Sequence, residues 1–408
     1  MRVVVRWLEP ALLWGFLLGL GVSISLAQLA LGALAVSWLV RLGEPGRRDR
    51  LPFPLLAPMG AFAAATVLAA LASARPVASL AGSKDLLLLA TVYLILHTLP
   101  GPEAAARLLS RLLLILAVVS VMAIVQVMAC PSDPGWIPLA ARFFKRCDRA
   151  HAFYSIYVTL AGVLSVGLLA VLPRLLPGGA DRRWWMAPAW AAGLVALALT
   201  YVRGAWIGLG AGLVVLGGLA RRGRWWLLAG LLAAVTTLVA GPPGLRQRAL
   251  SIADPADLTA RERVFMLRAG LAIARDHPLT GVGPGQVKEV YPRYVLPGAL
   301  RSQRSHVHNT PLRTLMERGP LGLLAWGWLW VAFFAETGRA LQRLAPGQAR
   351  ERTLIAGSIA AVAGFLVAGL FEFNFGDSEV AMVAYAVMAL ALAATRLEEA
   401  ARRDYTGV

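Results

Sequence analysis

Charged residues are scarce in this chain. Asp, Glu, Lys and Arg make up 15% of its 408 residues, whereas 58% are hydrophobic and the mean hydropathy is +0.65. A soluble domain has about 25% charged and roughly 45–50% apolar residues. No fold in water could cover this much apolar surface. The composition therefore excludes a disordered chain and most soluble enzymes, and it predicts an integral membrane protein.

Cysteine and acidic residues are also few. Two cysteines cannot build a disulfide framework, but Cys130 and Cys147 fall in one predicted outer loop, where an oxidising space would permit a single disulfide. Lys and Arg outnumber Asp and Glu by 40 to 22, which gives a net charge of +18. These basic residues are divided between loops on two sides of a membrane, so we expect no nucleic-acid partner.

Long uncharged apolar runs predict the fold. A membrane-spanning helix needs about 20 apolar residues, or somewhat fewer where neighbouring helices bury its ends. Arg2 and Arg6 before the first run are also typical of a signal peptide, but further spans follow directly. We predict an all-α, polytopic integral membrane helical bundle of about 12 transmembrane helices. The runs lie at 10–24, 26–40, 53–73, 86–99, 108–129, 152–172, 184–201, 205–220, 225–241, 320–335, 354–371 and 380–395.

Arginine in the short loops predicts the orientation. With the N-terminus inside, every short inner connection carries Arg, as the positive-inside rule requires. Both termini are then cytoplasmic. The predicted parts are transmembrane helices 1–9 in residues 1–241, a periplasmic catalytic loop at 242–319, and transmembrane helices 10–12 with a cytoplasmic tail in 320–408.

The long loop carries two helix signals. Thr259 and Glu262 have the spacing of a capping box, and apolar residues at 264, 267 and 271 follow at helical spacing up to the stop at Pro278. We expect this helix to lie along the membrane surface. A second helix is expected to start at Asn309, to hold Pro311 in its first turn and to continue into the tenth span.

Arg203 is the first candidate site residue. It is the only strong charge between 184 and 220, and it falls at the outer turn between two spans. A charge at membrane depth is costly and usually serves a ligand or a pathway. The alternative is an interfacial Arg that reaches lipid headgroups. Gly204, beside it, would permit a close backbone approach and slightly favours a ligand.

Arg263 is the second candidate. It lies in a loop whose cations are nearly all Arg, with Lys288 the only lysine. Guanidinium groups bind phosphate oxygens in pairs, whereas lysine provides a point charge, so this composition favours phosphate recognition. The alternative is a helix held on anionic headgroups.

His306 and His308 are the third candidates. The chain has five His, and these two lie just before the expected helix at Asn309. A neutral imidazole suits the abstraction of a proton from an attacking hydroxyl. Zinc is an alternative, but His-x-His without a nearby Cys or acidic ligand is a weak metal signature. A third alternative is a histidine that caps the helix or binds a loop carbonyl.

Three further features are weaker. Glu372, Asp377 and Glu379, at the outer end of the eleventh span, could orient a histidine, bind acceptor hydroxyls or only form a polar turn. The glycines at 281–285 lack the spacing of a dinucleotide fingerprint and predict a turn. Asp254 and Asp257 fit a turn followed by a helix cap better than a metal site. No Asp-x-Asp occurs on the outer side, so we expect no divalent metal and no other cofactor.

Together these residues resemble a known family. Arg-Gly-Ala-Trp at 203–206, Arg263 with His277–Gly283, His308-Asn309 with Glu317 and Gly319, and the block 371–379 resemble the O-antigen ligase/polymerase superfamily, over about residues 200–395. Many relatives have Trp where this chain has Leu267. The resemblance implies a glycosyltransferase of the bacterial inner membrane with a periplasmic active site.

The resemblance also implies the reaction. A glycan would move from undecaprenyl diphosphate to an acceptor hydroxyl, most simply on lipid A–core, with inversion and without metal. Arg203 and Arg263 would bind the diphosphate, and His308 would act at the acceptor. We add His306, Asn309, Glu317, Glu372 and Asp377 as expected substrate-binding residues. A glycan polymerase or a protein O-oligosaccharyltransferase would use the same donor, while a flippase or transporter for polyprenyl-linked glycans would place polar residues deep within several spans.

Overall fold

The described part of the protein is entirely helices, turns and loops. The computed structural model describes residues 2–42, 53–130, 143–144, 147–219, 243–252, 254, 257–299 and 307–406, and these ranges contain no strand. The helices in chain order are α1 (Arg2–Val22), α2 (Ile24–Arg41), α3 (Leu56–Leu71), α4 (Pro76–Gly82), α5 (Asp85–Thr98), α6 (Pro102–Met128), α8 (Tyr157–Val171), α9 (Met186–Leu199), α10 (Arg203–Leu219), α12 (Pro243–Leu250), α13 (Leu258–Asp276), α14 (Val287–Val290), α15 (Thr310–Arg343), α16 (Ala349–Ala368) and α17 (Ser378–Thr406).

The predicted spans coincide with these helices. Seven helical segments of the described ranges are long and apolar enough to cross a membrane, with α4 and α5 counted together, and shorter apolar segments occur in α1, α3, α9 and α10. Each expected span overlaps one of them, except the run 225–241, which lies outside the described residues. The all-α polytopic membrane bundle predicted from composition is therefore confirmed, while the number of spans stays a prediction.

Two helices form the centre of the bundle. Almost every side chain of α8, and of α17 as far as Ala394, is buried. A helix that is apolar on all sides can be buried in a protein core or can face lipid, and these two are buried by other helices. Helix α16 packs against α8, α10 and α17, while α5 packs against α17 and α6 against α9. Helices α8 and α17 thus occupy the interior.

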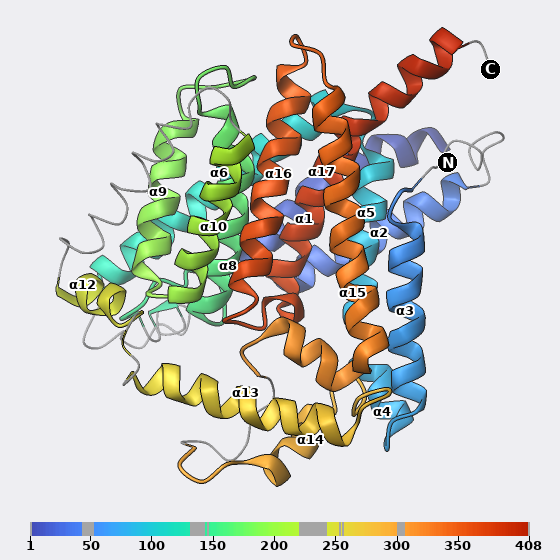
Figure 1. The fold of residues 1–408 in the computed structure, drawn as a ribbon. Helices are drawn as coiled ribbons and strands as arrows, with labels where there is room; N and C mark the ends of the chain where they lie inside the picture. The colour runs from blue at the N-terminus through green and yellow to red at the C-terminus, as the bar shows by residue number, and fades with distance from the viewer. Residues whose placement is uncertain are drawn as a thin grey trace.

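Segments that the sequence assigns to the outer side meet at one end of the bundle. Arg75, at the start of α4, forms an ion pair with Glu289 at 3.5 Å. Ser79 in α4 donates a hydrogen bond of 3.1 Å to the carbonyl oxygen of Pro284. Figure 1 shows α12, α13 and α14 beneath this end, with α13 crossing the ends of the bundle helices. The loop and the outer helix ends therefore form one layer.

Segments assigned to the inner side also contact one another. Arg350, at the start of α16, binds Asp181 at 2.7 Å and Glu103 at 3.1 Å. Arg174 donates to the carbonyl oxygen of Ala106 at 3.1 Å. Predicted inner loops pair with inner loops and outer loops with outer loops, as the expected alternation of spans requires. Which end faces the cytoplasm stays a prediction.

Helix α15 joins the outer layer to the bundle. It begins after Asn309, holds Pro311 in its first turn and runs to Arg343, as the sequence predicted. Gly319 interrupts it with φ 65° and ψ −173°, a conformation open essentially only to glycine, and Pro320 follows. The kink lies at the predicted boundary between the loop and the tenth span. The first part of α15 can therefore pack on α13 while the second part crosses the bundle.

Candidate functional site

A cavity of about 450 Å³ lies where the outer layer meets the bundle. We call it the Arg203 cavity. It is bounded by the start of α10, by α13, by the start of α15 and by the turn after α16. Arg203, Arg263, His308 and Asn309 line it. Four predicted site residues from three separate segments are thus brought together around one space.

Arg203 is held firmly at the edge of this cavity. It is the first residue of α10 and its side chain is 5% exposed. Its Nη1 donates to the carbonyl oxygen of Ser251 at 2.6 Å and to Ser251 Oγ at 2.9 Å, and its Nη2 donates to Asp257 Oδ1 at 2.7 Å. The helix dipole disfavours a cation at a helix N-terminus. The Asp257 carboxylate offsets that cost and orients the guanidinium.

Asp257 has two roles that the sequence only partly indicated. It is the N-cap of α13, and its Oδ1 accepts from the Ala260 backbone N–H at 3.0 Å. The cap expected after the 254–257 turn is confirmed, whereas the capping box with Thr259 as the cap is wrong. Burial alone raises the pKa of Asp257, but the hydrogen bonds from Arg203 and Ala260 outweigh it and leave the pKa below its usual value.

Glu372 joins Arg263 to His308. Arg263 Nη2 in α13 donates to Glu372 Oε1 at 2.6 Å, and His308 Nδ1 lies 2.7 Å from Glu372 Oε2. The Glu372 side chain is 11% exposed, so both interactions are sheltered from water. Gly204 permits this arrangement, because a Cβ there would lie 3.3 Å from Glu372 Cγ. Of the roles considered for Glu372, the geometry favours orientation of a histidine.

One nitrogen of Arg263 has no hydrogen-bond partner in the described part of the chain. Its Nε is buried and makes no hydrogen bond with any described residue. A buried donor without an acceptor is costly, and nearly all such groups in folded proteins are satisfied. Arg263 as a whole lines the cavity and its side chain is 23% exposed, so its guanidinium is a fixed cation at the cavity wall.

His308 is placed by the start of α15. Asn309 caps this helix, since its Oδ1 accepts from Leu312 N at 2.8 Å, and its Nδ2 donates to the carbonyl oxygen of Leu370 at 3.1 Å. Thr310 N donates to the carbonyl oxygen of Gly369 at 2.7 Å. These bonds fasten the start of α15 to the end of α16. They hold the imidazole of His308 against Glu372.

The contact with Glu372 determines which nitrogen of His308 is basic. An ionised carboxylate only accepts hydrogen bonds, so Nδ1 must carry the hydrogen. In the neutral ring the lone pair then belongs to Nε2. A proton taken up at Nε2 would give an imidazolium that Glu372 stabilises. This is the arrangement by which a buried carboxylate orients a histidine base.

The remaining walls of the Arg203 cavity are apolar. Side chains of α10, of α13, of the turn after α12 and of the turn after α16 form them: Ile207, Ile252, Val264, Met266, Leu267, Leu370 and Phe371. Helix α13 has two apolar faces. One packs against α15 and contains Met266, Ala269, Gly270 and Ile273. The other contains the predicted positions Val264, Leu267 and Leu271, which remain 40–46% exposed. The cavity can therefore take an apolar chain beside its charged groups.

Glu317 lies apart from these residues. Its Oε1 binds Arg313 at 2.6 Å and the Gly285 backbone N–H at 2.8 Å, and its Oε2 binds Arg318 at 2.9 Å. Arg318 in turn binds Asp85 in α5 at 2.5 Å. These groups are almost fully buried and connect α15 to the glycine turn and to the bundle. Glu317 thus has a structural role in these contacts. Its expected substrate contact stays a prediction.

Asp377 is not part of the cavity lining. Asp377 accepts from Thr159 Oγ1 of α8 at 2.6 Å, and burial raises its pKa. His306 lies outside the described residues. The glycine turn at 281–285 is confirmed, since Val282 N and Gly283 N donate to carbonyl oxygens of α15 at 2.8 and 3.0 Å. The substrate-binding roles of Asp377 and His306 stay predictions.

The two cysteines form a disulfide. Cys130 and Cys147 are bonded, with 5.5 Å between their Cα atoms, which is an ordinary separation for such a bond. The hypothesis based on their shared loop is therefore confirmed. A structural disulfide is typical of an oxidising compartment. The bond anchors the chain just before Asp148 and Arg149 to the end of α6.

Comparison with known proteins agrees with this geometry. Residues 188–327 match the O-antigen ligase family. This segment contains Arg203, Arg263 and His308, which line the cavity. The match covers about a third of the chain and supports a relation to the O-antigen ligase-like superfamily. It also supports a membrane enzyme of glycan transfer, of the ligase or polymerase type. No curated protein matches the chain. Glu372 lies beyond the matched segment, so its place beside His308 is evident only from the fold.

Proposed function

We propose that this O-antigen ligase-like protein transfers a glycan from undecaprenyl diphosphate to an acceptor hydroxyl in the Arg203 cavity. The observation that carries the proposal is the convergence of Arg203, Arg263 and His308 on one cavity with apolar walls. Two cations suit the diphosphate, the apolar walls suit the start of the polyprenyl chain, and the histidine suits a reacting hydroxyl. We take lipid A–core as the acceptor.

Arg203 and Arg263 act on the leaving group in this proposal. When the bond from the anomeric carbon to the diphosphate oxygen breaks, the leaving diphosphate gains negative charge. Guanidinium groups already fixed by Asp257 and Glu372 need little reorganisation to stabilise that charge. Both Arg203 and Arg263 line the cavity, so their guanidinium groups would lie beside the phosphate oxygens. The mechanism uses these cations where other glycosyltransferases use a divalent metal, so we expect turnover to persist in chelator.

His308 acts on the acceptor. The acceptor oxygen forms a bond to the anomeric carbon from the face opposite the diphosphate, while its proton passes to Nε2 of His308. Glu372 holds Nδ1 and stabilises the imidazolium. The products are the extended acceptor, with inverted configuration at that carbon, and undecaprenyl diphosphate. The proton leaves His308 to water before the next cycle.

We place this reaction on the periplasmic face of the bacterial inner membrane. The arginines of the short loops support cytoplasmic termini by the positive-inside rule. The disulfide lies at the same end of the bundle as the Arg203 cavity, since Ala150 N, three residues beyond Cys147, donates to Leu199 O near the start of α10. An oxidising compartment at that end agrees with this orientation.

A product assay tests the proposal and separates its variants. Purified protein receives undecaprenyl-diphosphate glycan with lipid A–core, with an unglycosylated acceptor protein, or alone. Extension of lipid A–core supports the ligase that we propose. Extension of the donor glycan alone identifies a polymerase, and modification of the protein identifies a protein O-oligosaccharyltransferase. Movement of the donor across a vesicle membrane, without any transfer, would identify a flippase and overturn the proposal.

A further inference from the structure

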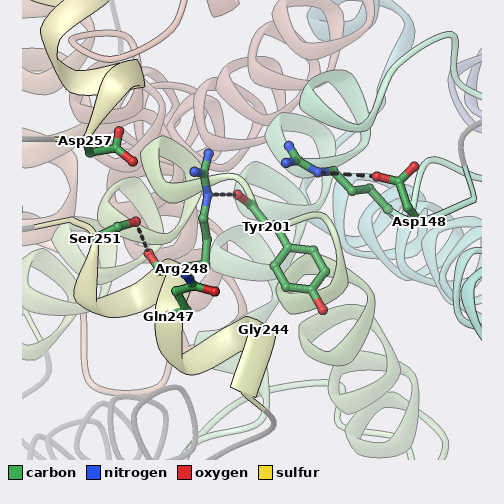
Figure 2. Close-up of a pocket in the computed structure, with 8 residues that line it drawn as sticks. Asp148, Tyr201, Gly244, Gln247, Arg248, Ser251 and Asp257 are labelled. Carbon is green, nitrogen blue, oxygen red and sulfur yellow. Dashed lines mark hydrogen bonds and ion pairs between the residues drawn. The ribbon is translucent and has the colours of Figure 1, made fainter.

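A second pocket adjoins the Arg203 cavity. It has a volume of about 340 Å³ and is lined by Asp148, Arg149, Tyr201, Gly244, Gln247, Arg248, Ser251 and Asp257. We call it the Arg248 pocket. Figure 2 shows Asp148 on one side and Ser251 and Asp257 on the other, with Arg248 rising from α12 between them. Ser251 and Asp257 are also the two residues that bind Arg203. The two spaces therefore share one wall.

Arg248 is aimed into this pocket by one hydrogen bond. Its Nε donates to the carbonyl oxygen of Tyr201 at 3.2 Å (Figure 2). Tyr201 has φ 56°, a left-handed conformation that is unusual for a residue with a side chain and that concentrates at functional sites. The terminal nitrogens of Arg248 have no hydrogen-bond or carboxylate partner in the described part of the chain.

Arg149 is held in place but not neutralised. Its guanidinium lies over the ring of Tyr157 at 4.6 Å, a contact that leaves the edge of the guanidinium open. Its carboxylate partner Asp148 is 3.9 Å away and 75% exposed, so the ion pair is weak. The Cys130–Cys147 disulfide and the bond from Ala150 N to the end of α9 fix the backbone on either side.

The pocket has an excess of positive charge. Asp257 is already bound to Arg203, which leaves the exposed Asp148 as the only other carboxylate of the lining. Burial lowers the pKa of Arg248, and the nearby charges of Arg203 and Arg149 lower it further. The charge of a bound anion would raise this pKa again. With Asp257 paired to Arg203, the cations Arg149 and Arg248 are balanced only by Asp148, so the pocket would accept one further negative group.

We propose that the Arg248 pocket binds an acidic sugar unit of a glycan substrate. Arg149 and Arg248 would bind its phosphate or carboxylate group, and the amide of Gln247 would bind a neighbouring hydroxyl. Ser251 and Asp257 line the pocket and also bind Arg203, so this unit would lie next to the bound diphosphate. This inference rests on the proposed glycan transfer, and it adds a specificity site for charge that the transfer itself does not require.

A binding measurement tests the pocket without turnover. Purified protein in phosphatidylcholine nanodiscs, which offer no anionic headgroup, is titrated with a hexose 6-phosphate and with the neutral hexose. We expect the phosphate to bind and Arg248→Gln or Arg149→Gln to weaken it about tenfold or more, as loss of a charge-assisted hydrogen bond implies. Arg248→Lys should restore part of the affinity. Arg246→Gln, on the exposed face of the same helix, is the matched control and should bind as the wild type does.

A kinetic measurement then identifies the substrate. The KM values for the donor and for the acceptor are compared between wild type and Arg248→Gln. Each substrate is supplied in two forms, one with the acidic group on its sugar and one without it. An increase confined to the acidic form of one substrate assigns the unit to that substrate. Equal phosphate binding by wild type and Arg248→Gln would overturn the proposal, as would lost binding with no change in either KM. If no transfer occurs at all, the proposed function fails, while the binding result still decides the pocket.

Discussion

His308 Nδ1 lies 2.7 Å from Glu372 Oε2, and the other oxygen of the same carboxylate binds Arg263 at 2.6 Å. One acidic side chain thus connects the proposed base to one of the proposed diphosphate ligands. The two halves of the site are therefore mechanically coupled. A change at Glu372 should disturb both acceptor activation and donor binding, whereas a change at Arg203 should disturb the donor alone.

Glu372→Gln should lower kcat of glycan transfer by about 100-fold, within the range that a positioned general base contributes. The amide can donate to Nδ1 and so favour the wrong tautomer of His308. The measurement is kcat and KM with purified protein. Glu289→Gln is a control, because Glu289 is exposed and pairs with Arg75 outside the cavity. Unchanged kcat in Glu372→Gln would remove Glu372 from the mechanism.

Arg203→Lys should reduce transfer by roughly 10- to 100-fold although it keeps the positive charge. Lysine cannot bind Ser251 and Asp257 and also present a fork to the diphosphate, and each charge-assisted hydrogen bond is worth about 1.5–3 kcal/mol. The measurement is kcat/KM for the polyprenyl-diphosphate donor. Arg246→Lys should retain full activity. A variant Arg203→Lys with wild-type kcat/KM would show that only charge matters here.

The Arg203–Asp257 pair should make stability depend on pH at the acidic end. Hydrogen bonds hold the pKa of Asp257 below its usual value of about 4, so the carboxylate stabilises the fold fully above that pH. The benefit is lost as the pH falls below about 4 through the lower pKa of the folded state. Wild type should therefore exceed Asp257→Asn in Tm at pH 7, and the difference should shrink towards pH 3. A difference independent of pH would contradict the ion pair.

Gly319→Ala should destabilise the fold by about 1–3 kcal/mol, the usual cost of a strained backbone conformation. A Cβ at residue 319 would lie 2.1 Å from the carbonyl oxygen of Leu279, and φ is positive there. The measurement is thermal unfolding in detergent. Gly327→Ala is the matched control in the same helix, since a Cβ there meets no atom within 4 Å and helix propensity favours Ala. Equal Tm values for the two variants would refute the role of the kink.

Removal of the disulfide should lower stability by about 2–4 kcal/mol. Cys130→Ser with Cys147→Ser, and wild type with reductant, should show a similar decrease in Tm. Reductant should not affect the double variant. If thiol titration found two free cysteines in protein isolated without reductant, both the disulfide and the oxidising location would be contradicted.

The helices of the bundle could be predicted because they follow from local properties. Apolar runs of the required length, Arg in alternate loops and the Asn309-Thr310-Pro311 start of α15 are each visible within a few residues. The burial pattern of α13 was harder to predict. The apolar positions 264, 267 and 271 predict one apolar face, but the face packed on α15 contains Met266, Ala269 and Ile273.

Candidate site residues could be chosen from the sequence, but their partners could not. Arg203, Arg263 and His308 were chosen by residue type and context, and the fold brings them around one cavity. The partner of Arg203 was missed, since Asp257 was interpreted only as a cap. The ion pairs of Glu317 with Arg313 and Arg318 were not predicted either, while its substrate contact stays a prediction. Partners of this kind depend on how distant segments pack, which no local pattern encodes.

The most direct test measures donor binding and transfer together. Undecaprenyl-diphosphate glycan and lipid A–core are supplied to purified wild type and to Arg203→Gln, Arg263→Gln, His308→Ala and Arg246→Gln. We expect the two Gln variants at the cavity to lose donor affinity and transfer, His308→Ala to bind donor but to transfer at least about 100-fold more slowly, and Arg246→Gln to match wild type. Wild-type transfer by Arg203→Gln and Arg263→Gln would contradict the account.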